Sequence, residues 1–540
     1  MLLLDNPVLQ RELLINLRTL RSFALLLGYN ALLGVVVILA WPQESRLNLS
    51  NNPESAKNLV NLFFLGQYLL VALMSPSFAA GAITGEKERH TYESLLASPL
   101  RPQAIVLGKL FASLAHLAVL LFSSLPIVML CLPLGGVSLY EVLTVYLGLI
   151  LSVTLFGMIS IACSSFFQRT SSALVVSYLL ILPLALFGVG VWNLFGNNGE
   201  ARLIFTLTIF PLISLGLTAM LFAMTSQRLL HPPDVGSEGK EVIDEERELR
   251  EAVGMVISRD RFPDSLIAPP KRSQLLPDHA NPVYDKELRS EIFAQGTLML
   301  RLVIQISLLL AFPLMAGVLF FVPELSAWYA AYVVLFNMLV GPVFNAGAIT
   351  SERERETLEL LLTTNLSSLQ ILGGKLFAGF RIAGALTALL FWPFLLAVIF
   401  RPYFWQNWQL VLAYPAIIIL TCLTTASVAL LASVICRKTA TSLIVSYLAI
   451  VVLFCLPPAL QFFAQSFYAN TPLVDAVETL SIVSPFSTLF KLPYLATDLK
   501  YSLSGSYASF WLYVSFTSAL IAGCWIALVM LFEFRWRSGE

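Results

Sequence analysis

The sequence predicts an all-α polytopic membrane protein with about 12 transmembrane helices in two parallel six-helix repeats. Composition is the first observation: the 540 residues are 57% hydrophobic and only 12% charged, which is too apolar for a soluble chain of this length. The second is an internal repeat, because residues 81–112 return at 347–378 without a gap and 18 of the 32 positions are identical. The third is that each copy places a short charged segment between two long apolar runs. The chain is therefore a tandem duplication built across a membrane.

The remaining composition excludes several classes of function. The formal net charge is zero, so the composition does not indicate a nucleic-acid-binding protein. The six cysteines lie in or beside apolar runs without paired spacing, so we expect no disulfide framework, no metal site and no cofactor. The first apolar run ends at Trp41 and Pro42 and not at a small-residue cleavage site, so we expect this run to remain as a span.

Each half is expected to begin with a helix on the membrane surface. Asn6 and Pro7 supply an N-cap followed by proline at the first helical position, and Asn281 and Pro282 repeat this arrangement. In the first half, leucines gather on one side of the following helix and arginines elsewhere, to about residue 21. This pattern is typical of a helix that lies in the interface and does not cross it.

A span needs roughly 20 apolar residues to cross about 30 Å of hydrocarbon. By this criterion the first half has spans near residues 22–41, 59–82, 108–131, 141–164, 172–195 and 203–226. The second half has spans near 300–322, 327–348, 374–399, 409–434, 441–464 and 510–533. Residues 465–508 are too broken for a full span, so we expect a partly buried external or re-entrant segment there.

Positive charge predicts the orientation. With the N-terminus inside, the external loops keep few of the 33 lysines and arginines, and both charged repeats face the cytoplasm, as does the C-terminus. Residues 231–280 switch to Pro, Asp, Glu, Lys and Arg, which indicates a charged cytoplasmic linker between a first repeat at 1–230 and a second at 281–540. Because an even number of spans precedes the linker, the two repeats run parallel.

The charged segment of each copy predicts a two-turn amphipathic helix at the membrane surface. In the second copy, Ser351 and Glu354 form a capping-box pattern that starts a helix, and Gly85 replaces the serine in the first copy. On such a helix one face collects Glu352, Arg355, Glu356 and Glu359, and the other collects Leu358, Leu361 and Leu362.

The segment is expected to receive force from a partner. The Gly-Lys pairs at 108–109 and 374–375 lack the upstream glycine and the following Ser or Thr of a phosphate-binding loop, so the chain is not expected to be an enzyme. A small helix that bears both charge signs and joins two spans can transmit the motion of a bound partner. The alternative is a loop that only orients the protein. Orientation needs Lys or Arg alone and would not select Glu86, Glu88 and Glu93 twice.

The pattern Glu-Arg-Glu-x-x-Thr-Leu-Glu-x-Leu-Leu, followed by Gly-Lys, resembles the cytoplasmic loop of type-2 ATP-binding-cassette (ABC) transporter permeases. The resemblance implies an interfacial elbow helix before the first span, and a coupling helix after the second span that binds a cleft on a separate ATPase subunit. His90 and Glu356 stand where the family often has glycine, and Asn365 replaces the proline found at Pro99. The coupling residues carried over by the resemblance are Glu86, Glu88, Arg89, Thr91 and Glu93, with Glu352, Glu354, Arg355, Thr357 and Glu359.

We therefore expect the permease of an ATP-driven ABC transporter in the plasma (inner) membrane, working as an exporter with two cytoplasmic ATPase subunits. One alternative is a channel or secondary carrier that needs no ATPase. The near-absence of acidic residues inside the spans argues against a proton- or sodium-coupled carrier. Another alternative is a membrane scaffold whose cytoplasmic loops recruit a partner without transport.

Overall fold

In a computed structural model of the protein, the described residues are 7–17, 20–40, 53–129, 138–167, 170–194, 199–230, 277, 280–289, 319, 326–467, 472–493 and 507–534. Regular structure within these ranges is entirely helical. The chain divides into two compact units, Met1–Glu251 and Ala252–Glu540. The dividing point falls inside the stretch expected to be the linker, nearly all of which lies outside the described residues, so the exact domain boundaries stay a prediction.

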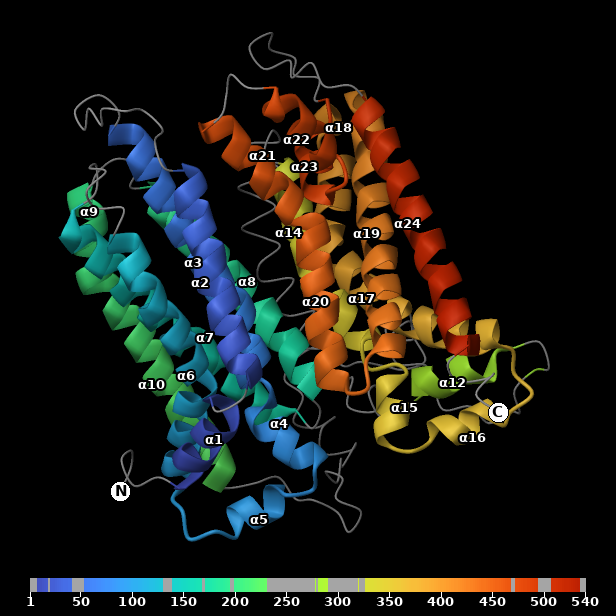
Figure 1. The fold of residues 1–540 in the computed structure, drawn as a ribbon, viewed down its shortest axis with the longest axis horizontal. Helices are drawn as coiled ribbons and strands as arrows, with labels where there is room; N and C mark the ends of the chain where they lie inside the picture. Colours follow the sequence, from blue (N-terminus) through green and yellow to red (C-terminus); the bar gives the residue numbers. More distant parts are fainter. Residues whose placement is uncertain are drawn as a thin grey trace. The chain divides into compact units, whose positions relative to one another are not determined.

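The first unit is a bundle around one central helix, α7 (Figure 1). Its helices are α1 (Pro7–Leu17), α2 (Leu20–Ala40), α3 (Pro53–Ala79), α4 (Gly81–Glu88), α5 (Tyr92–Leu96), α6 (Pro102–Met129), α7 (Leu139–Phe166), α8 (Thr170–Leu194), α9 (Gly199–Ile204) and α10 (Phe210–Leu230), with a π-helical turn at Phe205–Ile209. α7 contacts α3, α6, α8 and α10. Its buried residues include Gly157, Ser160 and Ser164, and small residues of this kind let transmembrane helices approach closely.

The second unit repeats this plan around α19. Its helices are α12 (Pro282–Arg289), α14 (Ser326–Asn345), α15 (Thr350–Glu354), α16 (Leu358–Leu362), α17 (Ser368–Phe400), α18 (Pro402–Gln406), α19 (Trp408–Ile435), α20 (Thr439–Phe454), α21 (Leu456–Phe467), α22 (Leu473–Ser481), α23 (Pro485–Lys491) and α24 (Ala508–Phe532). α19 contacts α14, α17, α20 and α24, which correspond in chain order to the four neighbours of α7. The duplication in sequence is thus a duplication in packing.

Ten helices in the described part of the chain are long and apolar enough to cross a membrane, which confirms an all-α polytopic protein. They are built on α3, α6, α7, α8 and α10 in the first unit and α14, α17, α19, α20 and α24 in the second. α2 lies where a further span was predicted, near 22–41. The span predicted near 300–322 lies almost wholly outside the described residues, so the count of twelve stays a prediction.

Residues 465–508 form short helices where the structure describes them, as their broken pattern predicts. α20 gives way to α21 at Cys455, and the hydroxyl of Ser484 donates to the carbonyl of Phe454 at 2.5 Å. Ser484 also caps α23, whose residues Pro485, Ser487 and Leu489 are buried. α23 contacts α14, α19 and α24. Among its described residues, the first unit has the short α9 at the corresponding place.

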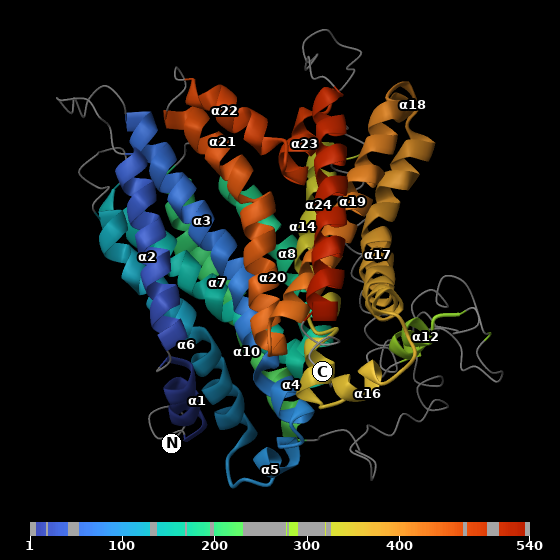
Figure 2. The same cartoon turned by 45° about the vertical axis from the view of Figure 1, so that its right-hand side comes forward.

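Within each unit the helix that was predicted to lie on the membrane surface, here called the predicted surface helix, is at the same end of the bundle as the charged segment (Figure 2). In the first unit this end holds α1, α4 and α5, and in the second it holds α12, α15 and α16. α1 contacts α6 and α12 contacts α17, so each predicted surface helix leans on the span that follows the charged segment. In the second unit Asn281 begins the helix as predicted, because its side-chain oxygen accepts from the N–H groups of Val283 (3.0 Å) and Tyr284 (3.4 Å).

Candidate coupling site

The charged segment of the second unit is a turn between two short helices. α15 ends, and Glu356 adopts a positive φ of 59°. The N–H of Glu356 donates to the carbonyl of Arg353 at 3.1 Å, and the N–H of Thr357 donates to the carbonyl of Glu352 at 2.9 Å. This pair of bonds is the Schellman arrangement, which closes a helix C-terminus through a left-handed residue. α16 begins after this closure, so the prediction of one continuous two-turn helix is wrong.

The first unit closes its turn in the same way. His90 adopts φ 57°, its N–H donates to the carbonyl of Lys87 at 3.2 Å, and the N–H of Thr91 donates to the carbonyl of Glu86 at 2.9 Å. The glycine that resembling loops carry at this position has a physical reason, because only a residue without Cβ adopts a positive φ freely. Histidine and glutamate stand in its place, so neither copy carries the glycine that would indicate a break in the helix here.

The capping box predicted at Ser351 is also wrong. α15 begins at Thr350 with no side-chain cap from its own segment. The N–H groups of Ile349 and Thr350 instead donate to the hydroxyl of Ser433 on α19, at 2.9 and 3.1 Å. A serine from the central helix therefore satisfies free donors at the start of α15, so no capping serine within the segment is needed there.

The first unit uses the same device, which explains how Gly85 can stand in place of a capping serine. The N–H groups of Ile83 and Thr84 donate to the hydroxyl of Ser164 on α7, at 3.0 and 2.9 Å. The start of each charged segment is thus pinned to the central helix of its unit.

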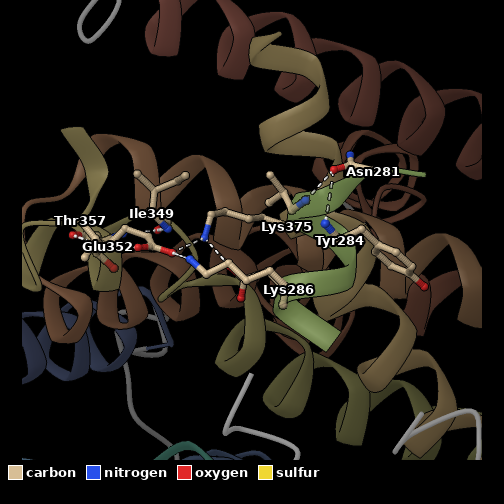
Figure 3. Close-up of polar contacts among 11 residues, drawn as sticks. Asn281, Tyr284, Lys286, Ile349, Glu352, Thr357 and Lys375 are labelled. Carbon is tan, nitrogen blue, oxygen red and sulfur yellow. Dashed lines mark hydrogen bonds and ion pairs between the residues drawn. The ribbon is translucent and has the colours of Figure 1, made fainter. Parts of the chain in front are cut away.

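A buried lysine, Lys375, contacts two acidic side chains in the second unit, and Figure 3 shows its contact with one of them, Glu352. Lys375 on α17 is only 4% exposed. Its Nζ lies 2.5 Å from Oε1 of Glu287 on α12 and 3.2 Å from Oε1 of Glu352 on α15. Nζ of the exposed Lys286 lies 3.0 Å from the same oxygen of Glu352. The cluster therefore joins the predicted surface helix, the charged segment and the following span.

Lys109 on α6 makes the equivalent cluster in the first unit. It is also 4% exposed. Its Nζ lies 3.3 Å from Oε1 of Glu86 and 3.6 Å from Oε1 of Glu12 on α1. Arg11 lies close enough to favour the charged form of Glu86, in the place that Lys286 takes in the second unit.

Both central carboxylates are held in the ionised form. Burial alone would raise the pKa of Glu352, but the charge of Lys375 and the hydrogen bonds from Thr357 and Lys286 lower the pKa to about 2. Burial likewise opposes the ionised form of Glu86, and the Thr91 hydroxyl and the Lys109 charge outweigh it, so its pKa also lies below the usual value. The clusters therefore keep their ion pairs at neutral pH.

The next acidic residue along each charged segment caps the helix that follows the central helix. Oε1 of Glu88 accepts from the N–H of Thr170, the first residue of α8, at 2.8 Å. Oε1 of Glu354 accepts from the N–H of Thr439, the first residue of α20, at 3.0 Å. Both acids therefore contact their own chain.

The ten predicted coupling residues thus divide into two groups. Six build the turn and its attachments: Glu86, Glu88, Thr91, Glu352, Glu354 and Thr357. The other four, Arg89, Glu93, Arg355 and Glu359, are exposed, as are Glu88, Thr91 and Glu354 of the first group. Sequence reasoning missed Ser164 and Ser433, because nothing local marks a serine within a span as the cap of a distant segment. It noted Lys109 and Lys375 only as matched positions, and their identity in both copies was the available signal.

Apolar contacts hold the charged segment of the second unit against the helices of that unit. Leu358 is buried, and Leu361 and Leu362 pack against the same cluster of buried side chains from α12, α17, α19 and α24. This confirms the apolar face expected of the segment, although the helix that carries it is shorter than predicted. Leu360 points away and is exposed.

The left-handed turn predicts opposite effects for two substitutions at one position. Glu356→Val is expected to destabilise the second unit by about 1–2 kcal/mol, because a β-branched side chain at positive φ meets the neighbouring carbonyl. Glu356→Gly is expected to leave stability unchanged or to raise it slightly, because glycine adopts this φ without strain. Denaturant titration of the purified chain in detergent micelles measures both variants. Equal behaviour of the two would contradict the assigned turn.

Comparison with known protein families identifies the family of the chain. A model described as ABC-2 family transporter protein matches residues 37–312, and a second model with the same description matches residues 202–535. No curated protein and no solved structure matches the chain. Each family match covers at least half of the sequence and together they reach across both units. The chain therefore belongs to the ABC-2 family of transporter proteins and is a multi-pass membrane permease component of an ABC transporter.

Proposed function

We propose that the two turns, α4 to α5 and α15 to α16, are the coupling sites at which two cytoplasmic ATPase subunits bind. One observation carries the proposal: the chain builds the same braced turn twice, with the same attachments to its own bundle and with exposed residues of both charge signs beyond them. An ATPase that moves such a turn moves the helices fastened to it, and opens the path through the permease alternately to each side.

The exposed residues are the ones that a partner can reach. Arg89 and Glu93 in the first unit, and Arg355 and Glu359 in the second, keep the same order of charge at each turn. Glu86 and Glu352, by contrast, are engaged with buried lysines. A substitution at Glu86 or Glu352 would disturb the turn itself and would not report on binding alone.

We further propose that both turns face the cytoplasm of a plasma membrane, with both termini on the same side, and that transport runs outward. The distribution of lysine and arginine supports the orientation. The outward direction is an expectation from the family resemblance. ATP-dependent movement of a fluorescent phospholipid in vesicles with inside-out orientation tests it, because amphipathic cargo suits spans rich in Leu, Val and Phe. A scaffold would show no movement that depends on ATP.

The binding test reverses one exposed charge in each turn. Glu93→Lys with Glu359→Lys is expected to weaken ATPase binding by at least about tenfold, or about 1.4 kcal/mol. The reason is that each new lysine would lie opposite ATPase groups that complement an acid. The measurement is copurification of the ATPase with the tagged full chain, followed by titration. The unfolding midpoint is expected to stay that of the native chain, because both side chains are exposed.

Glu200→Lys with Asp475→Lys is the matched control, since both acids are exposed and stand in segments predicted to be external. The control is expected to bind the ATPase as the native chain does. Retention of the ATPase by the Glu93 and Glu359 variant, or its absence from the native chain, would remove the basis for coupling at these turns.

A further inference from the structure

We propose that Lys87 with Glu88, and Arg353 with Glu354, form a clasp that carries the motion of each turn into the α7–α8 and α19–α20 junctions. The inference rests on the proposed coupling function and adds the route by which motion enters the bundle. Each turn is joined through the chain to the helices on either side of it, α3 with α6 and α14 with α17. The clasp adds the two helices that the turn does not join covalently.

The basic residue of each clasp binds the C-terminus of the central helix. Nζ of Lys87 donates to the carbonyls of Ser165 (2.8 Å) and Phe167 (2.9 Å), where α7 ends. Carbonyls in the last turn of a helix have no partner within the helix and carry partial negative charge. A lysine ammonium donates hydrogen bonds to these carbonyls and also complements their partial negative charge.

In the second unit an arginine performs the same task on α19. Nη1 of Arg353 donates to the carbonyl of Cys436 at 2.5 Å, and Nη2 lies 3.5 Å from the carbonyl of Val434. α19 ends at Ile435, between these two carbonyls. The two units therefore reach the same result with different basic side chains, which indicates that the contact and not the residue type has been kept.

The acidic residue of each clasp binds the N-terminus of the next helix. Glu88 accepts from the N–H of Thr170 at the start of α8. Glu354 accepts from both the N–H (3.0 Å) and the hydroxyl (2.7 Å) of Thr439 at the start of α20. Free N–H groups at a helix start carry partial positive charge, so a carboxylate is the complementary group.

The order of charge along the chain matches the order of the helix ends. A base followed by an acid meets a C-terminus followed by an N-terminus, so both contacts are attractive. In the reverse order both contacts would be repulsive. The order of two adjacent side chains therefore decides whether the turn and the junction move together.

Hydroxyl contacts complete the connection in both units. Oγ1 of Thr84 lies 3.0 Å from Oγ1 of Thr170, and Oγ1 of Thr350 lies 3.1 Å from Oγ1 of Thr439. The turn thus reaches the central helix and the helix after it through several short polar contacts within each unit. Side-chain networks of this kind have discrete arrangements and can transmit displacement.

The test exchanges the order of charge without changing composition. The variant carries Lys87→Glu, Glu88→Lys, Arg353→Glu and Glu354→Arg in the full chain, assembled with its ATPase. Hydrogen exchange is compared with and without ATP and vanadate at two places in each unit: the first turn of α6 or α17, and the junction of α7 with α8 or α19 with α20. In the native complex both places are expected to respond to nucleotide. In the variant the response at the junctions is expected to be lost, while the response of α6 and α17, compared at equal ATPase occupancy, is kept.

Conservative changes supply the rescue. Lys87→Arg and Arg353→Lys give each unit the base that the other already uses, and are expected to retain the response at the junction. If the exchanged variant does not fold, Glu88→Gln with Glu354→Gln weakens only the acidic contacts and is expected to reduce the same response.

The outcomes separate this inference from the proposed function. A native chain that binds no ATPase, or shows no response to nucleotide anywhere, overturns the coupling function and the clasp with it. A native response that persists unchanged at the junctions of the folded variants overturns the clasp alone, because coupling then enters without these four side chains.

Discussion

Lys375→Met is expected to destabilise the second unit by about 3–5 kcal/mol, because removing one partner of a buried ion cluster leaves the other charges without compensation. Nζ of Lys375 is the cation that lies between Glu287 and Glu352. Methionine fills a similar volume but offers no charge, so the two carboxylates would repel each other in a poorly solvated place. The unfolding midpoint in a denaturant titration of the chain in detergent micelles measures the loss.

Lys109→Met is the matched substitution in the first unit, and its effect is expected to be smaller. Its ion pairs are longer, at 3.3 and 3.6 Å against 2.5 and 3.2 Å for Lys375. The side chains of its partners Glu12 and Glu86 are 26% and 16% exposed, against 21% and 11% for Glu287 and Glu352. Water can therefore compensate more of the lost charge in the first unit.

A combined variant separates lost charge from lost packing. Adding Glu287→Gln and Glu352→Gln to Lys375→Met is expected to restore part of the stability, because neutral amides do not repel each other as two buried carboxylates do. If the triple variant were no more stable than Lys375→Met alone, the unpaired acids would not be the cause of the loss. The comparison is made at neutral pH, where the low pKa of Glu352 keeps its carboxylate ionised.

The spans and the equivalence of the two units could be predicted because both depend on patterns that the chain carries locally. A long apolar run is sufficient to indicate a transmembrane helix. Identical residues in two copies indicate identical surroundings, and Lys109 and Lys375 do occupy equivalent clusters. The tertiary partners of these lysines could not be predicted, because Glu12 and Glu287 lie far from them along the chain.

The direction in which each acid of the charged segment points could not be predicted either. An amphipathic pattern separates polar from apolar faces, but it does not distinguish an acid that faces a partner from one that faces a buried lysine. The break at Glu356 turns this ambiguity into an error, because residues on either side of a left-handed turn no longer share one helical face. Glu352 consequently faces Lys375, while Glu359 is exposed on the next helix.

This division gives the repeat two distinct roles. From the sequence alone, the order of residues repeated in both copies predicts partner binding. The contacts of Glu352 and Glu354 account for much of that constraint within the unit itself. A partner therefore needs to select only the few exposed positions, and the remainder of the pattern maintains the turn that presents them.

Gly374→Ala is expected to destabilise the second unit by about 1–3 kcal/mol, because the added methyl group would crowd the start of α12. A Cβ at this position would lie 3.0 Å from the backbone nitrogen of Tyr284 and 3.0 Å from Nδ2 of Asn281. Asn281 caps α12 and donates to the carbonyl of Gln370 at 2.7 Å, so neither group can move without disturbing the start of the predicted surface helix. Faster hydrogen exchange in α12 is the expected accompanying sign.

Gly373→Ala, one residue earlier on the same helix, is the control for this prediction. A Cβ there would meet nothing closer than 3.9 Å, at the ring of Trp525, which is an ordinary contact. Alanine is the better helix former by about 0.5–1 kcal/mol, so this variant is expected to be as stable as the native chain or slightly more stable. Similar losses at both glycines would show that general disturbance of α17, and not the close approach of α12, causes the effect. Opposite signs at two adjacent glycines would establish that α12 packs directly on Gly374, next to Lys375, which contacts the charged segment through Glu352.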